Sequence, residues 1–436
     1  MRNRTLFLVA VFVFLSLSSA PGWSQTVTEC DELAAFPGDP NSKVPGVDIN
    51  ELNPELALEA CQSAVKKFPN RSKYKFQLAR SHLAAKEFVA ARRAAVEAIN
   101  AGYPFANIIL GYLSIGGYLA EKDENKATSF YKKAADAGLA AAALIVAKRY
   151  LHGVGAEKNN KKSLEWFETA GKSGSVDAQI FLGRQFINGK IVAKDYERAQ
   201  LWFKRAAEAG SPEGLNGLGV IHDNGLGVPQ NFEKSFKYFL SASEAGSAAG
   251  SRNIGHMYEK GFGVDQNPSE AEKYYRQAIE GEFKPAEKDL AILLEDHPSL
   301  NADPAEINSL WQRVAERGDM YGVYRYGYRL ITGSGANRDL DLGREFMTRA
   351  ANSGDGFYQY EIGKIYERGL LGNKERNKAI EWYQKSAAAG EKLAKWALAN
   401  LILERKAGKL EIDRGLELLA ELASEGEAFN EITSLT

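Results

Sequence analysis

Small and apolar residues recur along this chain with a fixed period of about 36 residues. Each unit ends at a glycine, and one double step occurs where Gly281-Glu282 fills the slot with a shift of one residue. A constant period of this length is typical of stacked repeats, each of which contacts only its neighbours. The pattern therefore predicts an all-α solenoid rather than separate globular domains. The closing glycines are Gly102, Gly138, Gly174, Gly210, Gly246, Gly318, Gly354, Gly390 and Gly426.

Within each unit, the first half has the spacing of one helical face. Counting from the closing glycine as zero, position 4 is usually small, position 8 apolar, and position 12 large. Glycine inside a helix costs about 1 kcal/mol relative to alanine. Its recurrence at position 9 predicts that a second helix passes very close. Position 9 holds Gly111, Ala147, Gly183, Gly219, Gly255, Ala291, Gly327, Gly363 and Ala399.

The second half of each unit carries a turn and then a second helix. Glycine at position 15 is typical of a helix end that needs a positive φ. His297 and Arg405 replace it in two units, which we expect to turn differently. Positions 28 and 29 are aromatic or bulky, and their register with the small residues indicates core packing rather than a ladder for stacking a ligand. Asp or Asn at position 21 predicts the N-cap of the second helix: Asp123, Asn159, Asp195, Asn231, Asn267, Asp303 and Asp339.

The beginning of the chain has the pattern of an export signal. Residues 1–24 combine a basic start with an apolar run of about a dozen residues, from Leu6 to Leu17, and end in small residues. This pattern is typical of a cleaved secretory signal peptide and is too short for a good membrane span. The alternative is an uncleaved anchor. We expect a periplasmic or secreted protein with no stable membrane insertion after cleavage.

The cysteine content fits an oxidising compartment. The chain has two cysteines, Cys30 and Cys61. In an exported protein such a pair predicts one disulfide, although two free thiols are the alternative. The bond would tether segment 25–53, rich in Pro, Gly and Asp, to a helix that begins at Asn53-Pro54, where Asn is the expected N-cap.

Composition and motifs argue against several classes of function. Lys and Arg number 55 and Asp and Glu 56, so there is no basic footprint for nucleic acid. The histidines form no HxxxH or HExxH pair, and the glycine loops follow helices and lack the lysine of a phosphate-binding loop. No nucleophile or acid/base constellation stands out. We therefore predict no catalytic residue, no metal and no cofactor, and a protein that is not an enzyme.

Two repeat families are recognisable in these units. Segment 54–102 holds the first helix and a unit that resembles a tetratricopeptide repeat. From 103 to 426 the units follow the pattern AxxxLGxxYxxGxGVxxDxxKAxxWYxKAAxxG, which resembles the Sel1-like repeat; 427–436 form a tail. The resemblance implies a right-handed superhelical solenoid of about nine helix-turn-helix repeats that acts as a protein-interaction scaffold, often in exported bacterial proteins.

One group of residues has identities that the core does not dictate. By analogy with tetratricopeptide arrays, positions 3, 6, 10 and 13 of the first helix of each unit should face a concave groove. Tyr, Trp and Arg, which are enriched at interface hot spots, gather at or beside these positions in three consecutive units. The predicted partner site consists of Tyr321, Tyr324, Arg325, Tyr328, Arg329, Phe357, Tyr360, Lys364, Leu393 and Trp396, with Ile331 at the fourth position of the first set.

Three functions remain open for this aromatic stripe. The leading one is a scaffold or regulator that binds a protein or peptide, such as an envelope receptor or complex, along the concave face. The alternative is a binder or hydrolase of cell-wall glycans, and a third is a spacer without a ligand. The stripe could also be packed internally against adjacent units rather than open to a partner.

Overall fold

The computed structural model describes residues 27–335, 337–404 and 409–424. Within these ranges every regular element is an α-helix or a short 3-10 helix, which confirms the all-α prediction. The expected signal peptide, Arg405 and the tail 427–436 lie outside the described residues. No helix in the described ranges is both long enough and apolar enough to cross a membrane.

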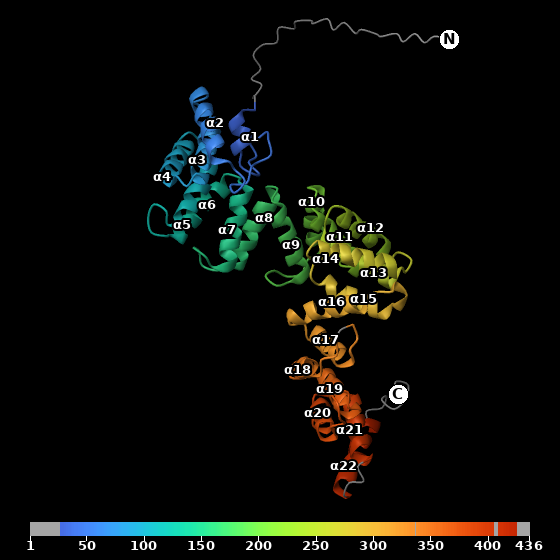
Figure 1. Ribbon diagram of the computed structural model, residues 1–436. Coiled ribbons are helices and arrows are strands. Elements are labelled where there is room, and N and C mark those ends of the chain that lie inside the picture. The colour runs from blue at the N-terminus through green and yellow to red at the C-terminus, as the bar shows by residue number, and fades with distance from the viewer. Residues whose placement is uncertain (1–26, 336, 405–408, 425–436) are drawn as a thin grey trace, which may run out of the picture. The chain divides into compact units, whose positions relative to one another are not determined.

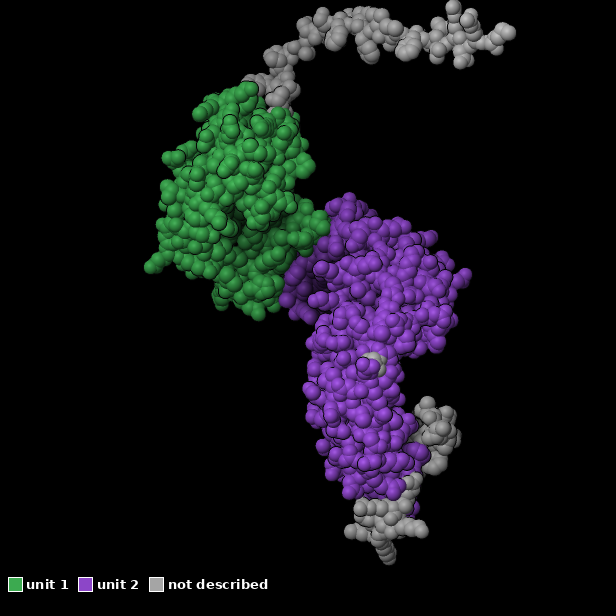
Figure 2. Space-filling view, in the orientation of Figure 1, with its two compact units in different colours: residues 1–179 green, residues 180–436 purple. Residues whose placement is uncertain are grey.

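The chain divides into two compact units, residues 1–179 and 180–436 (Figure 2). The helices of the first unit are α1 (Glu29–Ala34), α2 (Pro54–Lys67), α3 (Ser72–Ala84), α4 (Phe88–Asn100), η1 (Pro104–Ala106), α5 (Asn107–Gly116), α6 (Glu124–Asp136), α7 (Ala140–His152) and α8 (Asn160–Lys172). Helix α9 (Val176–Asn188) spans the division. The second unit continues with α10 (Tyr196–Glu208), α11 (Pro212–Asn224), α12 (Phe232–Glu244), α13 (Ala248–Lys260), α14 (Pro268–Glu280), α15 (Ala286–Asp296), η2 (Pro298–Leu300), α16 (Pro304–Glu316), α17 (Met320–Thr332), α18 (Leu340–Ala351), α19 (Gly356–Arg368), α20 (Arg376–Ala388), α21 (Lys392–Glu404) and α22 (Lys409–Ser424).

In each unit, consecutive helices pack against one another in the order of the sequence (Figure 1). From α5 onward they form tandem helix-turn-helix pairs, as the period predicts. The first helix of a pair ends at a glycine in the left-handed region, such as Gly225 at φ 63° and Gly261 at φ 73°. The second helix begins at the predicted N-cap; the Asn267 side chain, for example, accepts a hydrogen bond from the Glu270 amide. The sequence therefore predicted correctly where the first helix of a pair ends and where the second begins.

The two helices of a pair interlock at position 9. A Cβ added to Gly255 would lie 2.6 Å from a ring carbon of Tyr275, and one added to Gly363 would lie 2.6 Å from the ring of Tyr383. Both tyrosines, at position 29, are fully buried. This confirms the predicted close approach. Position 28 is only partly buried in several pairs, as at Tyr274 and Trp382.

A second set of loop glycines packs against the preceding repeat. A Cβ on Gly335 would collide with the carbonyl of Pro304, and one on Gly263 would collide with the backbone of Phe232. In both cases the neighbour is the first residue of the second helix in the previous pair, 31 positions earlier in the numbering. Each loop therefore depends on two successive repeats.

The double step in the glycine series has a local cause. Gly281 has φ −77°, and Glu282 takes the left-handed conformation instead, at φ 61°. The following helix, α15, ends at His297 without a left-handed glycine, and η2 and Asn301 at φ 53° complete the turn. The expectation that the unit with His297 turns differently is confirmed.

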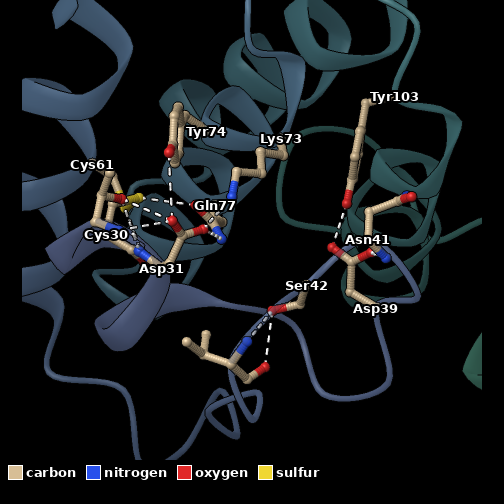
Figure 3. Close-up of polar contacts among 12 residues, drawn as sticks. Cys30, Asp31, Asp39, Asn41, Ser42, Cys61, Lys73, Tyr74, Gln77 and Tyr103 are labelled. Atoms are coloured by element: carbon tan, nitrogen blue, oxygen red, sulfur yellow. Dashed lines mark hydrogen bonds and ion pairs between the residues drawn. A yellow bond between two sulfur atoms is a disulfide. The ribbon is translucent and has the colours of Figure 1, made fainter. Parts of the chain in front are cut away.

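A polar network attaches the N-terminal segment to the first helical hairpin (Figure 3). Cys30 and Cys61 form the predicted disulfide, with Cα atoms 4.7 Å apart. Beside it, the buried Asp31 carboxylate accepts hydrogen bonds from Lys73 Nζ at 2.7 Å and Gln77 Nε2 at 3.1 Å. Burial alone would raise the pKa of Asp31, but these bonds and one from the Thr28 amide outweigh it and hold the pKa below its ordinary value.

Arg80 holds the same segment through hydrogen bonds to its backbone. Arg80 is 2% exposed, and its guanidinium donates to the carbonyl oxygens of Ala34 at 2.8 Å, Ala35 at 2.5 Å and Val47 at 2.6 Å. Burial lowers the pKa of Arg80 to about 10, so the side chain stays charged at neutral pH. The network gives order to a segment that is otherwise poor in apolar residues. The short helix α1, capped by Thr28, was not predicted from the sequence.

Candidate functional site

A hollow of about 440 Å³ lies between α17 and α19 in the second unit. Six of the ten residues predicted to bind a partner line it, together with four that were not predicted. The structure therefore gathers more than half of the predicted site in one place. The lining consists of Tyr321, Tyr324, Arg325, Tyr328, Phe357, Glu361, Lys364, Ile365, Arg368 and Leu370.

Two capped helices position these side chains. Asp319 caps α17 by accepting a hydrogen bond from the Gly322 amide at 3.0 Å, and Asp355 caps α19 by accepting one from the Phe357 amide at 2.9 Å. Because a helix turns once in 3.6 residues, side chains three and four positions apart share a face. Tyr324 and Tyr328 meet this condition on α17, and so do several lining residues of α19.

Tyr324 forms the floor of the hollow and joins the two helices. Its ring lies 5.4 Å from that of Phe357 and 5.8 Å from that of Tyr358, between centroids. Its hydroxyl donates to Glu361 Oε2 at 3.2 Å. Burial and the nearby carboxylate raise the pKa of Tyr324, so the phenol stays neutral. This side chain therefore both lines the hollow and holds α17 and α19 together.

The two arginines on α17 differ in their roles. Arg325 lines the hollow, where it donates to the Tyr321 hydroxyl at 3.1 Å and pairs with Glu295. Arg329 is 7% exposed and donates to Glu295 Oε1 at 2.8 Å and to the carbonyl of Pro304 at 2.8 Å. Arg329 therefore holds α15, α16 and α17 together and does not line the hollow.

The cationic side chains of α19 differ in whether they have a partner. Lys364 Nζ lies 2.8 Å from Glu361 Oε1 and 5.1 Å from the centroid of the Tyr360 ring. Arg368, one turn further along, is exposed, and no hydrogen bond or ion pair joins its side chain to any residue in the described ranges. Among the same residues, the Tyr328 hydroxyl also has no partner. These two groups are available to a ligand.

The other predicted residues lie outside the hollow. Tyr360 is partly buried, with its ring 5.6 Å from that of Tyr383, and Leu393 and Trp396 are partly buried on α21. Ile331, expected at the groove, is fully buried in the core. The two interpretations of the stripe therefore each describe a part of it: an open part around the hollow, and a packed part that consists of Ile331, Tyr360 and the residues of α21.

Sequence reasoning missed Glu361, Ile365, Arg368 and Leu370 as lining residues. The chosen positions 3, 6, 10 and 13 follow the tetratricopeptide analogy, whereas the lining side of α19 follows positions 3, 7, 10, 11 and 14. A helical projection from Phe357 would have found the three α19 residues, because they lie four, eight and eleven positions after it.

No group of three or more His, Cys, Asp or Glu side chains in the described ranges is arranged to hold a metal ion. His222 is buried and stacks on Tyr238 with centroids 5.6 Å apart, and burial lowers its pKa. It occupies a core position, as the large residue at position 12 was expected to do.

Comparison with known proteins identifies the repeats. The sequence profile of the Sel1 repeat matches residues 104–139, 140–175, 176–211, 212–247, 248–282, 321–355 and 357–391. The chain belongs to the Sel1 repeat family. The unmatched stretch, 283–320, begins directly after the irregular turn at Glu282 and contains the one at His297. Sel1 repeat proteins generally mediate protein–protein interactions, and the repeat is generally a non-enzymatic scaffold.

Solved structures of other proteins are similar to this chain, and two of them cover most of it. One is a protective antigen present in uropathogenic Escherichia coli strains and displaying an SLR fold, with 28% identity, a TM-score of 0.71, and coverage of 84% of this chain and 79% of the antigen. The other is a Sel1 repeat protein from Oxalobacter formigenes, with 21% identity, a TM-score of 0.52, and coverage of 86% and 99%. The second supports the fold alone. No curated protein matches the sequence.

Proposed function

We propose that this Sel1 repeat protein is an exported, non-enzymatic scaffold that binds a segment of a partner protein in the hollow between α17 and α19. The family supports a role in protein–protein interaction. The disulfide and the signal-like pattern of residues 1–24 support export to the periplasm or beyond the cell.

One observation supports this hollow as the binding surface. The hollow combines aromatic rings that remain partly accessible with polar groups that lack partners within the described structure. Phe357 is 40% exposed at this hollow, beside the partly buried rings of Tyr321, Tyr324 and Tyr328. Aromatic and arginine side chains around a depression are typical of interface hot spots.

The proposal is tested by comparing partners captured by wild type and by the double variant Tyr328→Ala/Phe357→Ala. Both side chains line the hollow, and neither makes a side-chain hydrogen bond to a described residue, so the fold should tolerate their loss. Leu201→Ala is the control, because Leu201 is 46% exposed on α10, outside the hollow. We expect the double variant alone to lose a partner. Identical partners for all three proteins would refute the site.

Export is tested separately by fractionating cells and trapping free thiols. We expect the chain in the exported fraction, shortened by about 24 residues, with Cys30 and Cys61 protected from alkylation until a reductant is added. A full-length, reduced chain in the cytoplasm would contradict this part of the proposal without affecting the binding surface.

A further inference from the structure

The charges around the hollow are unbalanced. The lining contains the cations Arg325, Lys364 and Arg368 and the carboxylate Glu361. Glu361 is only 8% exposed and is occupied on both oxygens, by Lys364 at 2.8 Å and by the Tyr324 hydroxyl at 3.2 Å. The surface that a ligand would meet is therefore positive.

Arg325 contributes little to this excess, because its guanidinium already pairs with Glu295. Arg368 contributes most, since it is exposed and makes no ion pair or hydrogen bond with the described residues. It is the last residue of α19, where the carbonyl end of the helix favours a cation. Lys364 lies four residues earlier on the same face. Because Lys364 already pairs with Glu361, Arg368 is the cation of this rim that has no partner in the described ranges.

The rest of the rim is apolar and aromatic. Phe357, which is 40% exposed, lines it from α19, and Tyr328 lines it from α17 with a hydroxyl that has no partner in the described ranges. A ligand that fits both halves has a carboxylate beside an apolar side chain. A planar guanidinium binds a carboxylate through two parallel hydrogen bonds, which makes Arg368 the better of the two cations for this contact.

We infer that the occupant is an acidic segment of a protein, with an Asp or Glu side chain on Arg368 and an adjacent apolar side chain beside Tyr328 and Phe357. This rests on the proposed function and adds to it the chemistry of the partner. An anionic polysaccharide would satisfy the cations but brings no comparable apolar side chain to the aromatic rim.

The test uses the purified chain and random peptides of about twelve residues displayed on phage, long enough to cross the hollow in an extended conformation. Peptides enriched on wild type are synthesised with a fluorescent label and titrated against four proteins: wild type, Arg368→Glu, Lys237→Glu and Tyr328→Ala/Phe357→Ala. Lys237 is an exposed lysine on α12, so its reversal makes the same change in net charge away from the hollow. Sodium polygalacturonate serves as the competing polyanion.

The expected peptides are rich in Asp or Glu next to Phe, Leu, Ile or Tyr. Their affinity should fall about tenfold or more in Arg368→Glu and by less than about twofold in Lys237→Glu. It should also weaken between about 0.05 M and about 0.5 M NaCl, because salt screens exposed charges.

The outcomes separate this inference from the proposed function. Peptides that need Tyr328 and Phe357, but show no acidic enrichment or are indifferent to Arg368→Glu, would overturn the inference and leave the binding site standing. Enriched peptides that bind the double variant as well as wild type would overturn both. If the selection enriches no acidic peptides and polygalacturonate binds with the same dependence on Arg368, the rim would be assigned to a glycan and the inference would be overturned.

Discussion

The hydroxyl of Tyr324 on α17 donates a hydrogen bond to Glu361 on α19, which connects two successive repeats through the floor of the hollow. Glu361 is buried, and its other oxygen pairs with Lys364. The bond therefore gives the carboxylate a second partner in a place that water hardly reaches. It also explains why a ring expected to contact a ligand is partly covered.

Tyr324→Phe should lower the free energy of unfolding of the second unit by about 0.5–1.5 kcal/mol, because one buried acceptor loses its donor while the ring stays. Urea denaturation followed by circular dichroism measures this change. Tyr328→Phe is the matched control, since its hydroxyl has no partner in the described ranges, and it should unfold as wild type does. Equal stability of all three proteins would show that the Tyr324 bond contributes nothing.

Gly255→Ala should destabilise the repeat formed by α13 and α14 by about 1–3 kcal/mol, because the new methyl group would lie 2.6 Å from the Tyr275 ring. The sign of the change in stability distinguishes a close contact from an open position. Without the close approach, alanine would stabilise a helix interior by about 1 kcal/mol relative to glycine. Chemical denaturation with hydrogen exchange over residues 248–280 gives the answer, and a stabilised variant would contradict the packing described above.

Loss of the Cys30–Cys61 bond should loosen the first helices without affecting the hollow. In a repeat protein each element contacts only its neighbours, so the effect should remain local. We expect the double variant Cys30→Ser/Cys61→Ser to lose about 2–4 kcal/mol of local stability. Hydrogen exchange should accelerate in α1 to α3 and remain unchanged in α17 to α19. Uniform acceleration along the chain would contradict this expectation.

The stability of the N-terminal network should depend on pH through the protonation of Asp31. Its folded pKa lies below the ordinary value, so its stabilising effect is fully present above about pH 4 and is lost as the pH falls through the folded pKa. Asp31→Asn should therefore cost about 1–3 kcal/mol at pH 7. The difference from wild type should shrink below about pH 4.

Hydrogen exchange in α1 and α3 at pH 7, 4 and 3 measures this difference and cancels the contributions of other carboxylates. Glu51→Gln is a suitable control, because Glu51 lies in the same segment, is exposed, and makes no side-chain hydrogen bond or ion pair with the described residues. A gap between wild type and Asp31→Asn that stays constant with pH would exclude Asp31 as the titrating group.

The sequence predicted those parts of the fold that repeat. Helix ends at Asn267 and Gly261 and the close contact at Gly255 follow from local rules, and each rule is repeated in several units. Arg80 and Asp31 could not be anticipated in the same way. Their partners come from an irregular segment that occurs once, so no period reveals which residues meet.

The candidate site lies between these two cases. Tyr321, Tyr324 and Phe357, which line the hollow, were predicted because their residue types are unusual for their repeat positions. Arg368 was missed because an arginine at a helix end is ordinary, and what distinguishes it is that its side chain has no partner among the described residues. A residue type can be read from one sequence, whereas an unpaired charge is a property of the surrounding structure.

The loop glycines that rest on the preceding repeat have an evolutionary consequence. Gly335 fits against Pro304 only while the chain between them keeps its length. Gain or loss of a few residues there would break that contact, whereas duplication or deletion of a whole repeat would recreate it at the new junction. Change in the length of this protein is thus quantised, and new binding surfaces can arise by adding a copy and then altering the exposed residues of its first helix.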